Sequence, residues 1–110
     1  LEFFVVKENM VVSVEEGREI INLRNDTMTV IKLHEAFQLK GKAPELIGGI
    51  VVIVQHQNRK LALLIDEVIG SQQLVIKSLP GLMKKIRGLR GCSILGDGKV
   101  SFILDIPKLV

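Results

Sequence analysis

Two histidines and one cysteine are the side chains of this chain with the most obvious reactive potential. Histidine is a common metal ligand, but the separation of His34 and His56 does not make a local ligand pair, and no HExxH or CxxC motif occurs. Cys92 is the single cysteine, so it cannot form an internal disulfide, and it suits a reducing cytoplasm as a small buried apolar residue. We therefore predict no metal site and no cofactor.

The candidate nucleophiles and carboxylates also lack the neighbours that catalysis needs. Asp66 and Glu67 are adjacent at an expected strand end, so their side chains point to opposite sides and cannot face each other as an acid–base pair. Ser93 and Ser101 lie in no GxSxG elbow and have no adjacent base. The segment Gly96–Gly98 precedes an expected strand, so it predicts a hairpin turn rather than a phosphate-binding loop. We predict no catalytic residue.

The size and composition indicate about one globular domain. The chain has 110 residues, of which 47% are apolar. Its longest apolar stretch, Leu46–Val54, is about half the length that a membrane span needs, so we expect a soluble chain without direct membrane insertion. The first residue is Leu1 and no secretion signal is readable, which is compatible with a piece of a longer protein.

The net charge is +3, and part of the positive excess lies in one short segment that lacks acidic residues. Lys84, Lys85, Arg87 and Arg90 lie in it, and such a cluster is able to hold phosphate. Nucleic-acid platforms combine basic grooves with stacking aromatics, whereas this chain has no Trp, no Tyr and four Phe. We favour a solvated loop and predict no nucleic-acid partner.

Runs of Val, Ile and Leu with few helical stripes predict a mainly β fold with short helices. Gly48 and Gly49 indicate a bulge or a close backbone approach within one strand. A helix of one or two turns is expected at His34–Leu39, and a Gly- and Pro-rich loop at Ser78–Gly91. The expected strands are Glu2–Lys7, Met10–Val14, Arg18–Arg24, Thr27–Leu33, Leu46–His56, Leu61–Ile65, Gln72–Lys77, Ser93–Gly96 and Lys99–Ile106.

One strand–turn–strand unit occurs twice. INLRNDTMTVI, which begins at Ile21, aligns with SILGDGKVSFI, which begins at Ser93, at a constant offset of 72 residues. The alignment matches Leu23 with Leu95 and Ile31 with Ile103. A duplicated hairpin predicts two related β lobes, and the polar stretch Lys40–Pro44 is the best candidate for their boundary.

Three segments resemble a known family. LALLIDEVIGSQQLVIKSL and GCSILGDGKVSFILDIPKLV resemble the CheW-like regulatory domain at the C-terminus of the chemotaxis histidine kinase CheA, and VEEGREIINLRNDTMTVIKLHEAFQL resembles an upstream part of it. The string Ile94–Val100 with Ile103–Asp105 is similar to the kinase version, whereas Asp66–Gly70 is shared with the coupling protein CheW. The resemblance covers almost the whole chain.

The resemblance implies a CheW-like fold of two small SH3-like, five-stranded β-barrel lobes. It divides a single domain, residues 1–110, into the remainder of the first lobe (1–42) and a mainly second-lobe part (43–110), with strands that the lobes can share. Family members begin with a strand pair that this chain lacks, so we expect an incomplete first lobe. Either a neighbouring copy of the chain pairs with the exposed strand edges, through self-association or strand exchange, or the lobe is distorted.

The resemblance also implies a function. It points to a non-catalytic regulatory and adaptor domain that binds CheW and chemoreceptor tips, in the cytoplasm at membrane-associated receptor arrays. The chain itself is then no enzyme, whereas its parent is an ATP-dependent protein-histidine kinase. A free-standing CheW-type coupling protein is the alternative, and a basic β-barrel module for nucleic acid is a more distant one.

Apolar tips of lobe-end loops, ringed by charge, are the expected partner contacts. Each apolar tip can instead be part of the core or a lid over a barrel end. We favour this second interpretation for the first hairpin, and for the loop we give the two interpretations equal weight. The predicted contacts are Leu82, Met83 and Ile86 in the loop, Met28 in the first hairpin, and Arg24 and Lys85 as rim charges.

Overall fold

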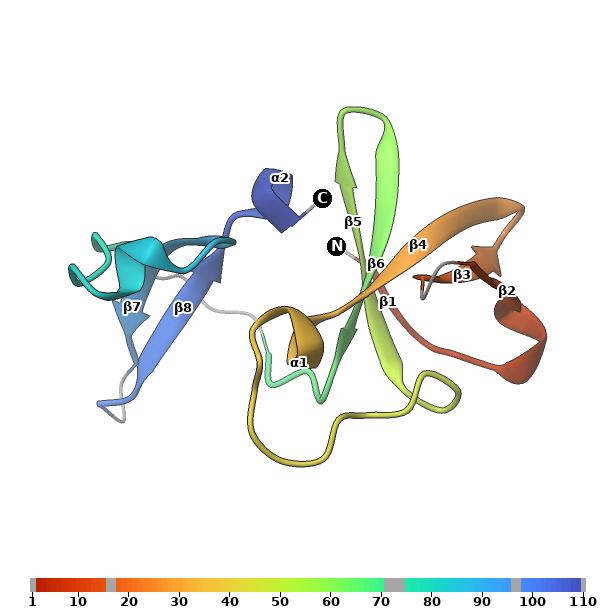
Figure 1. Cartoon of the computed structure of the whole chain (residues 1–110), viewed down its shortest axis with the longest axis horizontal. Helices are drawn as coiled ribbons and strands as arrows, with labels where there is room; N and C mark the ends of the chain where they lie inside the picture. The colour runs from red at the N-terminus through yellow and green to blue at the C-terminus, as the bar shows by residue number, and fades with distance from the viewer. Residues whose placement is uncertain (1, 16–17, 71–74, 96–97, 110) are drawn as a thin grey trace. The chain divides into compact units, whose positions relative to one another are not determined.

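A computed structural model describes residues 2–15, 18–70, 75–95 and 98–109. The chain forms two compact units, Leu1–Ile69 and Gly70–Val110, and each is described by itself. Most of the described regular structure is β and the helices are short, which confirms the predicted fold class (Figure 1). None of the helices within the described ranges has the length and apolar character that a membrane span requires.

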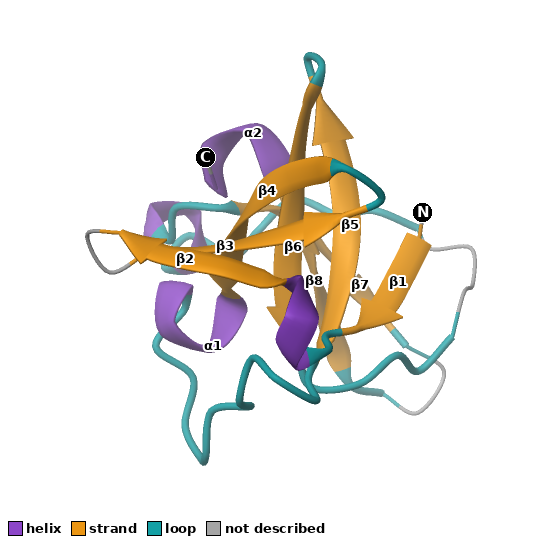
Figure 2. Cartoon of the chain, turned by 90° about the vertical axis from the view of Figure 1, so that its right-hand side faces the viewer, coloured by secondary structure: helices purple, strands orange, loops and turns teal. Residues whose placement is uncertain are grey.

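The first unit is built on one six-stranded sheet with the strand order β1-β5-β6-β4-β3-β2. The sheet is strongly curled, as Figure 2 shows for β4, β3 and β2 against β5 and β6. Its elements are β1 (Glu2–Val5), the 3₁₀ helix η1 (Glu8–Met10), β2 (Val11–Glu15), β3 (Arg18–Leu23), β4 (Asp26–Lys32), α1 (Leu33–Ala36), β5 (Ile50–His56) and β6 (Arg59–Ile65).

A tight turn joins the two strands in each of the two long hairpins of this sheet. Arg24 and Asn25, with φ of 53° and 65°, join β3 to β4, one residue earlier than the predicted Asn25-Asp26 turn. Gln57 and Asn58, with φ of 48° and 64°, join β5 to β6. Two consecutive positive φ angles match the right-handed twist of a hairpin, so both connections favour antiparallel pairing of neighbours in the sequence.

Strand β4 instead runs parallel to β6, with Thr29 opposite Leu61. Parallel neighbours need a connection that brings the chain back to the same end of the sheet. Residues 33–49, which we call the crossover, begin with α1 and carry the chain from β4 to β5, and β5 then returns it to the start of β6. Strand β6 lies between β4 and β5, so both of its edges are paired. Its consecutive residues Leu61, Ala62, Leu63 and Leu64 are all buried, which means that both of its faces are covered as well.

The core lies in this first unit. It consists of buried side chains from β3, β4, β5, β6, the segment after β1 and the segment before β5, with partly buried Phe4, Met10 and Leu23 packed against them. The buried set is Val6, Ile21, Met28, Val30, Leu46, Val51, Ala62 and Leu64.

Gly49 makes the close backbone approach that the sequence predicted. A Cβ atom at this position would lie 2.4 Å from the Glu45 carbonyl oxygen and 2.8 Å from Leu64 Cδ1. The Val6 amide donates to the Gly49 carbonyl at 2.8 Å, and the Gly48 amide donates to the Val6 carbonyl at 2.8 Å. The glycine pair therefore anchors the end of β1 against the core.

The second unit contains a two-stranded antiparallel sheet. Lys77 adds a bridge to Cys92 through backbone hydrogen bonds of 2.8 and 3.0 Å. The first half of the predicted strand Gln72–Lys77, residues 72–74, lies outside the described residues. The elements of this unit are the 3₁₀ helix η2 (Met83–Lys85), β7 (Leu89–Ile94), β8 (Val100–Leu104) and α2 (Ile106–Leu109).

Both copies of the sequence repeat form hairpins, but their registers differ by one residue. In the first copy Leu23 pairs with Asp26, whereas in the second the Leu95 amide donates to the Lys99 carbonyl at 2.8 Å. The second connection is thus one residue longer, and a β-bulge between Leu89 and Gly91 absorbs the difference. Asp97, half of the predicted Asp97-Gly98 turn, lies outside the described residues.

The chain divides after Ile69, whereas the sequence placed a lobe boundary between residues 42 and 43. The reason is that β5 and β6, predicted as mainly second-lobe strands, pair with β1 and β4. How the two units correspond to the two lobes of the family stays a prediction.

Candidate partner-binding surface

The loop between Ser78 and Gly88 is tied to the second unit at both ends. At its start, Cys92 Sγ lies 3.7 Å from the Ser78 carbonyl oxygen, next to the Lys77–Cys92 bridge. At its end, the Asp105 amide donates to the Gly88 carbonyl at 2.7 Å, and Arg87 Nε donates to the Lys108 carbonyl at 3.1 Å. The loop therefore starts beside β7, at the Lys77–Cys92 bridge, and leads into the first residue of β7 with both ends fixed.

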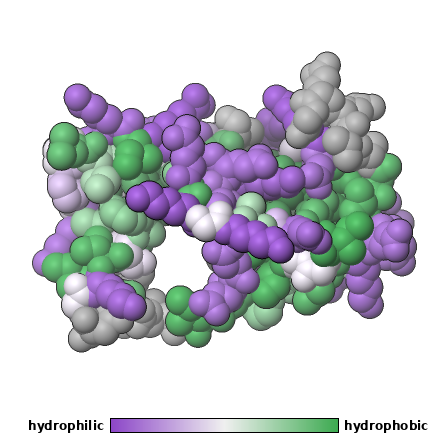
Figure 3. All heavy atoms as spheres, turned by 60° about the horizontal axis from the view of Figure 1, so that its bottom comes forward, coloured by the Kyte–Doolittle hydropathy of each residue, from purple (hydrophilic) through white to green (hydrophobic). Residues whose placement is uncertain are grey.

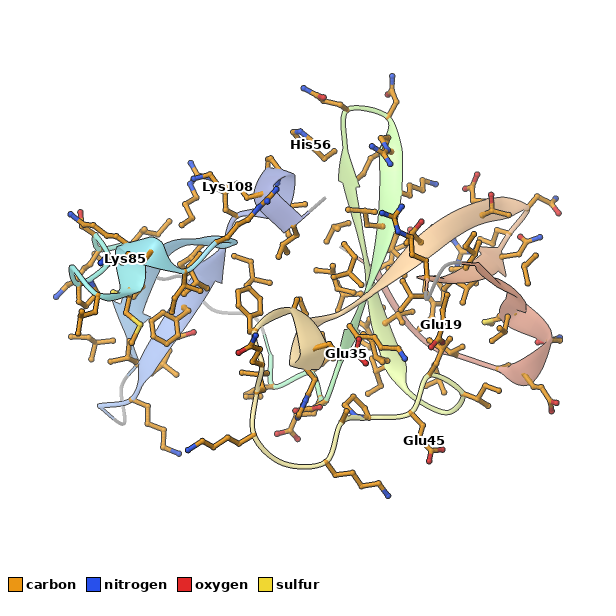
Figure 4. The ribbon with its side chains drawn as sticks, viewed as in Figure 1. Glu19, Glu35, Glu45, His56, Lys85 and Lys108 are labelled. Carbon is orange, nitrogen blue, oxygen red and sulfur yellow. The ribbon has the colours of Figure 1, made fainter. Side chains whose placement is uncertain are left out.

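Inside this loop, η2 presents apolar side chains next to basic ones. The Met83 and Lys84 amides both donate to the Pro80 carbonyl, at 2.9 and 3.2 Å, which closes a turn and leaves the preceding Leu82 at its tip. Leu82 is 83% exposed and Ile86 is 40% exposed. Lys84 and Lys85 are exposed beside them, and Figure 4 labels Lys85 on the loop. We call Leu82, Met83, Lys85 and Ile86 the η2 tip.

The two units differ in charge. Residues 70–110 carry seven Lys and Arg against two Asp, a net charge of +5, whereas residues 1–69 carry eight Lys and Arg against ten Asp and Glu, a net charge of −2. The η2 tip lies in the basic unit. A partner face that meets it is therefore favoured when it is acidic.

Arg24, predicted as a rim charge, has partners within the first unit. Its Nη1 lies 3.1 Å from Glu2 Oε2, and its guanidinium carbon lies 5.0 Å from the centroid of the Phe4 ring. These contacts tie the β3–β4 turn to β1. Arg24 remains exposed, so whether it also contacts a partner stays a prediction.

Met28, the other first-hairpin candidate, is buried with 4% exposure and belongs to the core cluster. This is the interpretation that the sequence analysis favoured for it. Since a buried thioether cannot reach a partner, we do not retain Met28 as a contact residue.

A second ion pair fixes the start of the crossover. Lys32 Nζ lies 2.5 Å from Glu19 Oε1, and both side chains are less than one third exposed. The hydrogen bond to Glu19 raises the pKa of Lys32 above its usual value, against an opposing effect of burial, and the negative charges of Glu19 and Glu35 add to the rise. Figure 4 labels Glu35 on α1, which follows Lys32 directly.

The histidines and adjacent carboxylates of the chain do not gather into a site among the described residues. His34 lies in α1 and His56 at the end of β5, and Asp66 and Glu67 are exposed after β6. Among the described residues, no group of three or more His, Cys, Asp and Glu side chains has a metal-binding arrangement. A hollow of about 300 Å³ between the crossover and β5–β6 is lined by Glu45 and Asp66 together with apolar and glycine residues.

Several exposed apolar residues of the second unit were missed as surface features. Val100 and Phe102 in β8 are 54% and 42% exposed, and Ile94 opposite Val100 is 58% exposed. The sequence predicted a strand from their alternation, which a strand packed on one face also produces. Green apolar atoms reach the surface of both units in Figure 3, so apolar exposure is not confined to the η2 tip.

Comparison with known proteins supplies the family. Residues 7–110 match the CheW-like domain. The chain belongs to this family. A crystal structure of the scaffolding protein TtCheW from Thermoanaerobacter tengcongensis has the same fold, with a TM-score of 0.70 and 25% identity over 96% of this chain and 75% of that one.

Relatives of this CheW-like domain include the chemotaxis protein CheA of several bacteria. The chain is 37% identical to CheA of Klebsiella aerogenes over 84% of its length, and 34% identical to CheA of Treponema pallidum over 96%. In both cases it spans 14% of the relative's length. The predicted CheW-like domain related to CheA is thereby confirmed.

Proposed function

We propose that this CheW-like domain is the regulatory and adaptor domain of a chemotaxis histidine kinase. It binds the coupling protein CheW and chemoreceptor tips, and in this way transmits the state of the receptor to a separate catalytic domain. The observation that carries the proposal is the 37% identity to CheA over most of the chain, within a family match that spans residues 7–110. The proposed place of action is the cytoplasmic receptor array.

The η2 tip supports an adaptor role by its composition. It combines exposed Leu82 and Ile86 with Lys85, on a loop whose ends are held by hydrogen bonds. Apolar anchors with a charged rim are the usual arrangement of a protein-binding hot spot, and fixed loop ends reduce the entropy lost on binding. We therefore propose Leu82, Met83 and Ile86 as anchors and Lys85 as a rim charge.

Titration calorimetry with purified CheW and with a receptor-tip fragment tests this function. Leu82→Ala combined with Met83→Ala is expected to weaken one of the two complexes by about tenfold or more, because hot-spot truncations have effects of this size. Ile94→Ala is the matched control, since Ile94 is an exposed apolar residue of the same unit outside the loop. Unchanged affinities for both partners in the folded double variant would remove the η2 tip from the proposal.

A free-standing coupling protein is the second candidate, supported by the similarity to the TtCheW structure. Reading the gene on both sides of this segment distinguishes the two. A kinase domain requires an ATP-binding domain encoded upstream in the same reading frame, whereas a coupling protein requires an open reading frame of CheW length.

A nucleic-acid-binding module is the distant candidate, supported by the net charge of +5 over residues 70–110. It requires affinity for DNA or RNA that falls linearly with salt on logarithmic axes. Electrophoretic mobility shifts at two salt concentrations test it, and no shift at low salt eliminates it.

A further inference from the structure

The sheet of the first unit ends in β1, and the outward backbone groups of this strand can be identified. Val6, directly after β1, donates its amide to Gly49 and accepts from Gly48, so its backbone groups point toward β5. Backbone groups alternate in direction along a strand, so those of Phe4 also point toward β5, whereas those of Phe3 and Val5 point outward. Among the described residues no strand pairs with this outer edge.

Strand β1 is short, but it lacks the bulge and the proline that often protect the edges of sheets. The opposite edge strand, β2, contains a register shift between Val11 and Ser13 of the kind that discourages pairing with another chain. Strand β1 has regular pairing with β5 and contains no proline. Its side chains Phe3 and Val5 are 57% and 55% exposed. An apolar, regular edge of this kind is open to a further strand.

One antiparallel register makes β1 complementary to itself. With Phe4 opposite Phe4 of a second copy, Phe3 lies opposite Val5 of that copy, and Val5 opposite its Phe3. Because Phe3 and Val5 have the outward backbone groups, each of the two pairs exchanges two backbone hydrogen bonds. Pairs of an aromatic and a β-branched side chain are also among the stabilising cross-strand pairs.

Charge favours the same orientation. Glu2 begins the strand and Lys7 follows its end, and both are exposed. Antiparallel pairing brings the acidic end of each strand to the basic end of the other, whereas parallel pairing places like charges together. We propose that the occupant of the β1 edge is β1 of a second copy of this chain, so that two six-stranded sheets join into one sheet across a two-fold axis.

Analytical ultracentrifugation of the full chain, from micromolar to millimolar concentration, tests the proposal. The expected result is a monomer–dimer equilibrium whose dissociation constant rises about tenfold or more in Val5→Lys and in Phe3→Lys, since each substitution occurs twice in the interface. Val100→Lys in β8 is the matched control, because Val100 is 54% exposed against 55% for Val5. The control is expected to dimerise like the unmodified chain.

A disulfide test separates the register from any effect of the substitutions on folding. In a Cys92→Ser background, Phe3→Cys with Val5→Cys is expected to form a covalent dimer on oxidation, since a hydrogen-bonded pair has its Cα atoms about 5.5 Å apart, within the range of disulfides. Either single cysteine is expected to stay monomeric, because neither residue faces itself.

Three outcomes overturn the proposal. A chain that stays monomeric at millimolar concentration excludes a second copy as the occupant and would favour a strand of another protein at the β1 edge. Weakening by Val100→Lys without weakening by Val5→Lys moves the contact to β8. Disulfide formation by the single variants as readily as by the double variant excludes the register.

Discussion

Gly49→Ala is the substitution whose effect the structure defines most sharply. The added Cβ would lie 2.4 Å from the Glu45 carbonyl oxygen and 2.8 Å from Leu64 Cδ1. The first atom belongs to the backbone and the second to a side chain that is 2% exposed, so neither can move freely. Overpacking of a tight site costs about 1–3 kcal/mol, and displacement of the Val6–Gly49 hydrogen bond adds about 1 kcal/mol, so we expect a loss of about 2–4 kcal/mol.

Thermal unfolding followed by circular dichroism measures this loss. For a chain of this size it corresponds to a fall in Tm of roughly 10 °C or more. Gly81→Ala is the control, because nothing lies within 4 Å of its Cβ position and its φ is not in the left-handed region. Gly48→Ala isolates the backbone effect, since that position is open but has a φ of +86°, and we expect a cost of about 1 kcal/mol. Equal melting temperatures for Gly49→Ala and Gly81→Ala would contradict the close approach at Gly49.

Three further substitutions test other contacts. Glu19→Gln is expected to cost about 0.5–1 kcal/mol at neutral pH, as measured by denaturant unfolding. Because the pKa of Lys32 is raised in the folded state, the ion pair contributes its full stability below the usual lysine pKa. The difference in unfolding free energy between Glu19→Gln and the unmodified chain should therefore disappear as the pH rises through the pKa of Lys32 in the folded chain. A difference that grows in this pH range contradicts the assignment. Arg24→Gly should be more stable than Arg24→Ala by about 1 kcal/mol, because position 24 has a φ of 53°, and equal melting temperatures would argue against backbone strain. Gly91→Ala places a Cβ 2.9 Å from both Ile76 Cγ2 and the Lys77 carbonyl oxygen, so it should speed hydrogen exchange at the Cys92 amide, which donates to that oxygen, and unchanged protection would contradict the contact.

The sequence predicted the β elements well where alternation and turn residues agreed. The hairpin at Arg18–Leu33 and the strand ending at His56 both formed, because residues with a tolerance for positive φ lie between strongly apolar runs. The order of the strands was not predictable in the same way. Nothing in the residues of β4 specifies a parallel neighbour 32 residues later, where Leu61 lies opposite Thr29, since that pairing is decided by the packing of the whole sheet.

The candidate contact residues were also predictable where local sequence decides their exposure, and not where the packing of the sheet decides it. Leu82 and Ile86 lie in a loop whose Gly and Pro content predicts exposure, and they are exposed. Met28 lies in a strand, where a side chain faces either the core or solvent, and only its cross-strand neighbours place it inside. The two contacts of Arg24 depend on the curl of the sheet, which brings a turn to a strand that is remote in sequence.

The central position of β5 and β6 has a consequence for how the chain folds. Strand β1 is synthesised first, yet its neighbour in the sheet begins 45 residues after it ends, and β4 also waits for β6. The β5–β6 hairpin, closed by a two-residue turn, is the element that both β1 and β4 pair with in the finished sheet. On the ribosome, β1 and the β6-facing edge of β4 therefore stay without their sheet partners until residue 65 has left the exit tunnel, although β2, β3 and β4 can already pair with one another, and the six-stranded sheet becomes continuous only when its central hairpin is complete.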